Sequence, residues 1–80
     1  MDDTAWQGIA SWFHTFVRGY ERENSLHPML QLKVNHSLRV AAESRSIAGE
    51  LGWPTRSVRM AETVGLLHDI GRFPQFDRFQ

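Results

Sequence analysis

Three polar side chains, those of His36, His68 and Asp69, could bind one metal ion. His68 and Asp69 are adjacent within the segment LLHDIGR, and His36 lies 32 positions earlier (68 − 36) within the segment HSLRVA. Neutral imidazoles and carboxylates are good ligands for Fe, Mn, Co, Ni and Zn, and weaker ones for Mg. Two histidines and one aspartate leave coordination positions open, and a hydrolytic metal needs these for water. The residue types therefore predict a divalent-metal site suited to hydrolysis, without identifying the metal.

Each of these residues also has a simpler structural interpretation. A histidine on an apolar helix face is usually a hydrogen-bonded core residue, so His36 alone would not indicate a ligand. Asp69 near a helix C-terminus interacts unfavourably with the helix dipole, and a bound metal would supply a reason for its position. Arg72 and, more weakly, Arg39 are candidates to bind phosphate. Arg72 could instead lie at a helix end in solvent, and Arg39 could form a surface salt bridge.

The two segments together resemble the HD superfamily of metal-dependent phosphohydrolases, from about Lys33 to the end of the chain. This resemblance implies that His36 and His68 are the two metal-binding histidines. It also implies that Asp69 is the catalytic carboxylate, which can bridge two metals, and that Arg72 faces a phosphate. The implied fold is an all-α bundle. The implied chemistry is attack of metal-bound water on a phosphate ester, with a nucleotide or another small phosphate ester as the substrate.

The family pattern contains a further aspartate on a later helix, well downstream of the HD pair. Only Asp77 follows here, eight residues after Asp69 (77 − 69), and that spacing does not fit the role. We therefore expect the chain to correspond to the N-terminal part of an HD domain. We also expect this 80-residue form to lack one ligand of the complete catalytic set.

The composition excludes several classes of protein. Residues 1–80 suit one small domain, and the absence of cysteine excludes disulfides and thiolate ligands. Nine basic residues balance nine acidic ones, whereas a general nucleic-acid binder would be strongly basic. No apolar segment approaches the roughly 20 residues that span a bilayer, and the acidic start is unlike a secretory signal. We therefore expect a cytoplasmic protein that binds neither a membrane nor nucleic acid.

Three helices are predicted, over residues 3–22, 28–51 and 55–70, and no strand pattern occurs. The helix periodicity gives the first helix one buried stripe: Trp6, Ile9, Ala10, Phe13, Phe16, Val17 and Tyr20. In the second helix the side facing the core is predicted to carry Met29, Lys33, His36, Val40, Ile47 and Leu51. The third helix should begin at Thr55 as its N-cap and end at Gly71. Gly65 within it indicates a close helix crossing.

The C-terminal tail carries three aromatic rings, Phe73, Phe76 and Phe79, without obvious partners. These rings suggest a second hypothesis from another functional class: a non-catalytic, all-α interaction or regulatory module that forms homo-oligomers through its aromatic surface. A third hypothesis, a small helical DNA binder, uses Arg56 and Arg59 near a helix start. The zero net charge and the apolar character of that helix argue against it.

Overall fold

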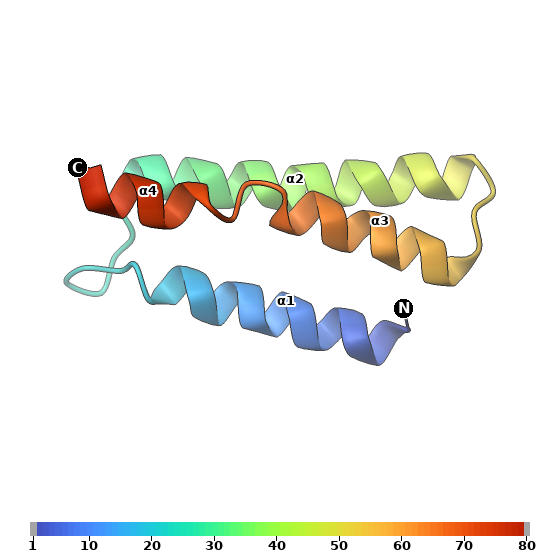
Figure 1. Ribbon diagram of the computed structural model, residues 1–80, viewed down its shortest axis with the longest axis horizontal. Helices are drawn as coiled ribbons and strands as arrows, with labels where there is room; N and C mark the ends of the chain where they lie inside the picture. The colour runs from blue at the N-terminus through green and yellow to red at the C-terminus, as the bar shows by residue number, and fades with distance from the viewer. Residues whose placement is uncertain (1, 80) are drawn as a thin grey trace.

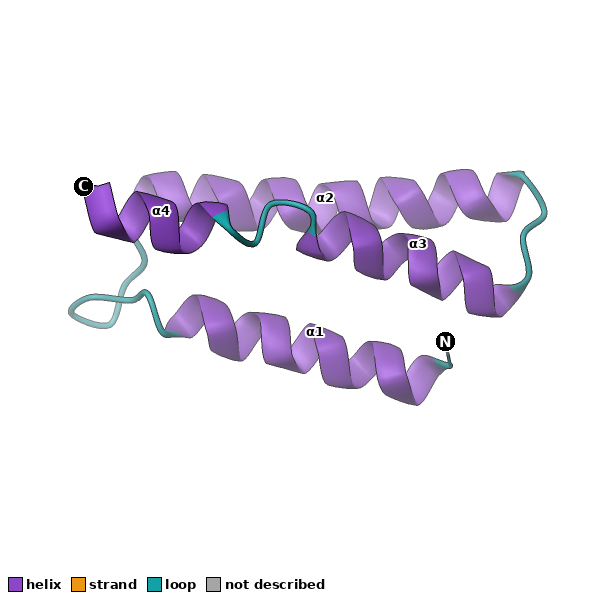
Figure 2. Ribbon diagram, viewed as in Figure 1, coloured by secondary structure: helices purple, strands orange, loops and turns teal. Residues whose placement is uncertain are grey.

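The chain folds into four α-helices, and no strand is present among residues 2–79, which the computed structural model describes (Figures 1 and 2). The helices are α1 (Asp3–Arg18), α2 (Pro28–Glu50), α3 (Thr55–Leu67) and α4 (Arg72–Phe79). The side chains of residues 77–79 lie outside the description. In Figure 1, α2 runs the length of the molecule, α3 and α4 follow each other alongside it, and α1 lies below. The expected all-α fold is confirmed.

The predicted apolar stripe of α1 forms its inner face. Phe13 and Val17 are buried, and the partly buried members of the stripe pack against the same core: Trp6, Ile9, Phe16 and Tyr20. The helix begins where the Asp2 carboxylate accepts a hydrogen bond from the backbone N–H of Ala5, at 2.8 Å. This N-cap satisfies one of the backbone donors left free at a helix start.

The prediction that the first helix continues to residue 22 is wrong, because α1 ends at Arg18. After Arg18 the backbone hydrogen bonds join residues three apart instead of four, as between the N–H of Tyr20 and the carbonyl of Val17. Glu23 and Asn24 then take positive φ values of 54° and 66°. Two successive left-handed residues are typical of a tight reversing turn, and this turn redirects the chain into α2.

The boundaries of α2 follow from local hydrogen bonding. The Nδ1 atom of His27 accepts the backbone N–H of Met29 at 3.1 Å and caps the helix start, with Pro28 in the first turn. At the other end Gly52 has φ 77°, and the N–H groups of Gly52 and Trp53 return to the carbonyls of Gly49 and Ala48. This pair of bonds is a Schellman motif, so the predicted stop at Gly52 is confirmed.

The predicted inner face of α2 is wrong. Met29, Ile47 and Leu51 are about half to two-thirds exposed, at 48%, 58% and 65%. The face that is actually buried carries smaller side chains over much of its length: Leu30, Val34, Ser37, Ala41 and Ala48. Large apolar residues dominate a hydrophobicity pattern, whereas a close helix crossing selects small ones, and this explains the error. His36 consequently lies at the edge of the core rather than within it.

Gly65 allows α3 to approach α2 closely, as expected. A Cβ added at Gly65 would lie 2.8 Å from Ser44 Oγ, 3.0 Å from the Val40 carbonyl oxygen and 3.1 Å from Ala41 Cα. Two of these three neighbours are backbone atoms, which cannot rotate away. The two helices can therefore keep this separation only with glycine at position 65.

The third helix ends earlier than predicted, at Leu67 rather than near residue 70, and Thr55 is its first residue rather than its N-cap. Pro54 occupies the N-cap position without a side-chain cap. Residues 68–71 form a turn with hydrogen bonds of three-residue spacing, from Ile70 N–H to the Leu67 carbonyl and from Arg72 N–H to the Asp69 carbonyl. The chain then enters α4, a helix that the sequence analysis did not predict.

Burial of Phe73 accounts for the position of α4. Its ring is fully buried and lies 6.3 Å from the Phe13 ring, 5.8 Å from Phe16 and 6.0 Å from Tyr20, measured between centroids. Phe76 is partly buried, 4.9 Å from the His27 ring. The expectation that the tail rings lack partners within the chain is therefore wrong for Phe73 and Phe76. The side chain of Phe79 lies outside the described residues.

Arg59 ties α3 to the start of α1. Its Nε donates to Asp3 Oδ1 and its Nη1 to Glu62 Oε1, each at 2.7 Å, and its guanidinium lies 5.7 Å from the Trp6 ring centroid. These bonds, first that to Glu62 and then that to Asp3, raise the pKa of Arg59 above its ordinary value. Its side chain is only 17% exposed, so Arg59 is largely engaged within the fold.

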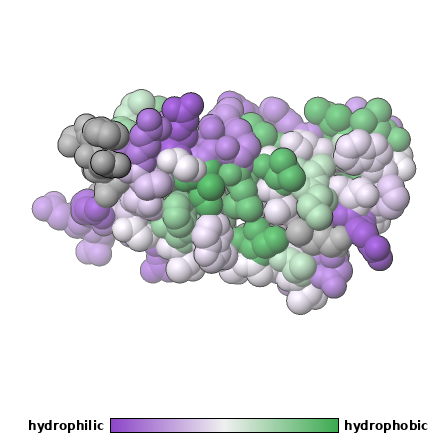
Figure 3. All heavy atoms as spheres, in the orientation of Figure 1, coloured by the Kyte–Doolittle hydropathy of each residue, from purple (hydrophilic) through white to green (hydrophobic). Residues whose placement is uncertain are grey.

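The surface retains several large apolar side chains. Figure 3 shows apolar residues gathered at the upper right, over the C-terminal end of α2. The exposed set includes Leu32, Leu38, Ile47, Leu51, Trp53, Met60 and Val64. Within the part of the chain that is described, no helix combines the length and the apolar character needed to cross a membrane.

Replacing Gly65 with alanine tests the helix crossing. We expect Gly65→Ala to lower the free energy of unfolding by about 1–3 kcal/mol, because the new methyl group overpacks the contact with α2. Gly8→Ala is the matched control, since its Cβ would meet no atom within 4 Å apart from the neighbouring backbone of its own helix. That change should raise the free energy by up to about 1 kcal/mol through helix propensity. Urea unfolding followed by circular dichroism would contradict the crossing if both variants were equally stable.

Truncation of the two described tail rings tests the packing of α4. Phe73→Ala should lower the free energy of unfolding by about 3–5 kcal/mol, because it removes a fully buried ring. Phe76→Ala should cost clearly less, since that ring is only partly buried. Thermal unfolding of both variants measures the difference, and equal, small effects would show that α4 does not depend on Phe73.

Candidate metal centre

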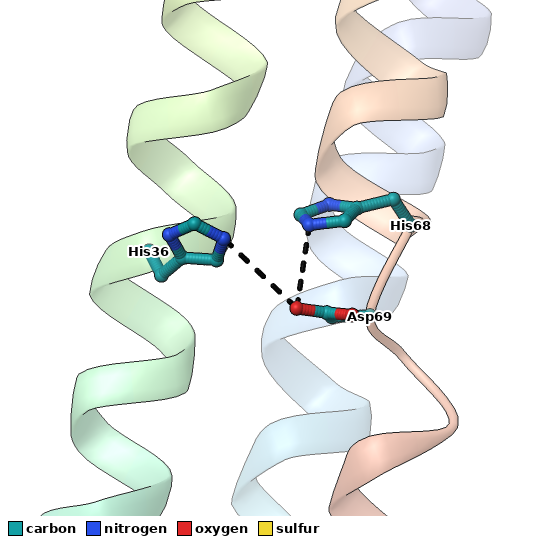
Figure 4. Close-up of side chains that lie close together, drawn as sticks. All are labelled: His36, His68 and Asp69. Atoms are coloured by element: carbon teal, nitrogen blue, oxygen red, sulfur yellow. Dashed lines mark ion pairs between the residues drawn. The ribbon is translucent and has the colours of Figure 1, made fainter.

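Three potential metal ligands, one from α2 and two from the turn that follows α3, converge at the end of α3. His36 comes from α2, His68 immediately follows α3, and Asp69 lies in the turn before α4 (Figure 4). The Nε2 atoms of His36 and His68 lie 3.9 Å and 3.3 Å from Asp69 Oδ2. One ligand atom from each of the three residues lies within 4.8 Å of the others. The three side chains therefore form a group that could hold a metal ion.

The end of α3 explains how two adjacent residues face one site. On a continuous α-helix, neighbouring side chains point about 100° apart. Here the helical hydrogen bonding stops at Leu67, and Asp69 lies in a turn with three-residue bonds. The close crossing at Gly65 brings α2 alongside this turn, so that His36 completes the group.

A backbone hydrogen bond orients His68. Its Nδ1 lies 2.6 Å from the carbonyl oxygen of Gly65. A carbonyl oxygen can only accept, so the hydrogen must be on Nδ1 and the lone pair of the neutral ring is on Nε2. Nε2 is the atom that faces Asp69. A histidine whose second nitrogen donates to a carbonyl is typical of metal sites, because that bond fixes both the tautomer and the ring plane.

The site is open to solvent. The side chains of His36, His68 and Asp69 are 43%, 34% and 35% exposed, and the two imidazole rings meet edge to face with centroids 5.3 Å apart. Solvent can therefore reach the coordination positions that these three donors leave vacant. Two imidazole nitrogens and one carboxylate oxygen fit a divalent transition metal.

The two arginines proposed for phosphate binding lie differently. Arg39, one turn after His36, places Nη2 3.1 Å from His36 Nδ1 and Nε 3.9 Å from Glu43 Oε1. Arg72 is exposed at the first position of α4, and its guanidinium has no ion pair among the side chains that are described. Arg39 thus contacts a potential ligand directly, whereas Arg72 faces solvent near the turn that carries Asp69.

Two features of the site were not found by sequence reasoning. The carbonyl of Gly65 orients His68, whereas a glycine in a helical sequence indicates only close packing. The contact from Arg39 to the second nitrogen of His36 was also missed. The three-residue spacing of His36 and Arg39 within one helix was the available signal, because residues three apart are neighbours on a helix surface.

Comparison with known proteins agrees with this geometry. A family model described as the HD domain matches residues 34–80, a segment that contains all three converging side chains. No curated protein and no solved structure matches the chain. The family model covers more than half of the sequence, and the chain therefore belongs to the HD domain family.

Proposed function

We propose that this chain is a metal-dependent phosphohydrolase domain that binds one divalent cation through His36, His68 and Asp69. The convergence of these three side chains is the observation that carries the proposal. His36 is distant from the other two in sequence, and the fold brings it to them. Membership of the HD domain family supports it. The cation would be Mn, Fe, Co, Ni, Zn or Mg, all of which accept nitrogen and oxygen donors.

Each residue has a chemical role in this proposal. A divalent cation, when bound, polarises a phosphoryl oxygen and lowers the pKa of a coordinated water. The imidazoles of His36 and His68 supply neutral donors, and the Asp69 carboxylate offsets part of the cation's charge. Arg72, exposed at the start of α4 directly after the turn that carries Asp69, would attract the phosphate of a small ester or nucleotide. Asp69 is thus the residue on which both binding and catalysis depend.

The alternative function, a module that oligomerises through Phe73, Phe76 and Phe79, has lost part of its basis. Phe73 is fully buried against α1 within one chain, and Phe76 is partly buried. A ring that already fills the core contributes no surface to a second copy. Homo-oligomer formation stays a prediction, and no contact among the described residues favours it over the enzyme.

Metal content tests the ligand set. We expect the protein, purified without chelator and incubated with Mn²⁺ or Zn²⁺, to retain about one ion per chain by elemental analysis. His36→Ala and His68→Ala should each lose affinity by more than the roughly 10- to 100-fold typical of an outer partner, because they remove a ligand. His14→Ala is the control, since His14 lies exposed on α1. Equal metal content in all four proteins would contradict the site.

Turnover of a generic phosphate monoester tests the chemistry. We expect p-nitrophenyl phosphate hydrolysis by the Mn²⁺-incubated protein to be abolished by chelator and to fall about 100-fold or more in Asp69→Asn. The amide retains the size of the carboxylate but not its charge. Arg72→Met should mainly raise KM, since it removes a phosphate contact rather than a metal ligand. Activity that survives both the chelator and Asp69→Asn would contradict a metal-dependent mechanism.

A further inference from the structure

The Nδ1 atoms of the two histidines have different kinds of hydrogen-bond partner, an acceptor for His68 and a donor for His36. His68 Nδ1 lies 2.6 Å from the Gly65 carbonyl oxygen, which can only accept a hydrogen bond. His36 Nδ1 lies 3.1 Å from Nη2 of Arg39, and a guanidinium can only donate. The neutral rings therefore hold opposite tautomers: His68 carries its hydrogen on Nδ1, and His36 carries it on Nε2.

This difference matters because a metal ion binds the nitrogen that has a free lone pair. His68 presents such a lone pair on Nε2, the atom 3.3 Å from Asp69 Oδ2. His36 directs its Nε2 toward the same oxygen at 3.9 Å, but with a hydrogen attached. Only one of the two imidazoles is ready to bind a cation between them.

Both ways of coordinating His36 require Arg39 to leave. Coordination through Nε2 requires the hydrogen to move to Nδ1, where it would meet the N–H of Arg39. Coordination through Nδ1 requires the lone pair that the same N–H already occupies. A guanidinium cannot give up its hydrogens, so no rearrangement of protons at Arg39 removes the conflict.

We propose that Arg39 competes with the metal ion for His36, so that metal uptake displaces the Arg39 guanidinium. This inference rests on the proposed function, because it concerns the same three ligands. The Arg39 side chain is free to move: it is 67% exposed, and its other contact is a 3.9 Å ion pair with Glu43, itself 62% exposed. Exposed ion pairs of this kind hold a side chain only weakly.

The tautomers can be read directly by ¹⁵N NMR of the imidazole nitrogens. In the metal-free protein we expect the hydrogen on Nδ1 for His68 and on Nε2 for His36. After addition of Zn²⁺, which is diamagnetic, both rings should carry the hydrogen on Nδ1. A metal-free protein whose His36 already carries it on Nδ1 would overturn the proposal.

Zinc affinity gives an independent test. Arg39→Met removes the donor, and calorimetric titration should show zinc binding about three- to tenfold tighter, the equivalent of one net hydrogen bond. Arg45→Met is the matched control, because it removes the same charge from the same helix nine residues after His36 (45 − 36). In about 1 M salt, where the screening length is about 3 Å, the loss of a distant charge has little effect, so the control should bind zinc with the affinity of the parent. Equal affinities for both variants would overturn the proposal.

Zinc binding by the histidine variants and the arginine variants together separates this inference from the function on which it rests. If His36→Ala and His68→Ala bind zinc as tightly as the parent, the three-ligand site is wrong and the competition by Arg39 fails with it. If those two variants lose zinc while Arg39→Met and Arg45→Met bind it equally, the site stands and only the role of Arg39 fails.

Discussion

The close crossing of α2 and α3 at Gly65 is the constraint on which the rest of the structure depends. The missing side chain at this position lets the backbone of one helix lie directly against the other. The same residue offers its carbonyl oxygen to His68, so packing and site geometry share one point. His36 reaches His68 and Asp69 only because the two helices are held at this separation.

The buried aromatic cluster around Phe73 fixes the start of α4, immediately after the turn that carries Asp69. Phe73 anchors the start of α4 against α1, and the turn between α3 and α4 carries Asp69. The turn is therefore held at both ends, by the helix crossing before it and by the buried ring after it. A small domain buries only about 60% of its unfolded surface, so this anchoring is needed to hold the ligands in one geometry.

The sequence predicts the parts of this structure that depend on local signals. The stripe of α1, the glycine stop of α2 and the close crossing at Gly65 were all readable from residue types and spacing. The inner face of α2 was not, because Ser37, Ala41 and Ala48 are selected by contact distance rather than by hydropathy. The helix α4 was missed because Phe73 is recognisable as a core residue only when α1 lies beside it. Likewise, the type and spacing of His36, His68 and Asp69 suggested a site, but the tautomers depend on atoms that only the fold brings together.

Two histidines and one aspartate, from α2 and from the turn after α3, bind the same ion in the site proposed here. X-ray absorption spectroscopy of the zinc-loaded protein tests it most directly. We predict two imidazole nitrogens at about 2.0–2.1 Å from the zinc, with oxygen ligands completing its coordination, and one imidazole fewer in His36→Ala. A zinc ion with a single imidazole ligand, or with ligands unchanged by His36→Ala, would contradict binding by both histidines.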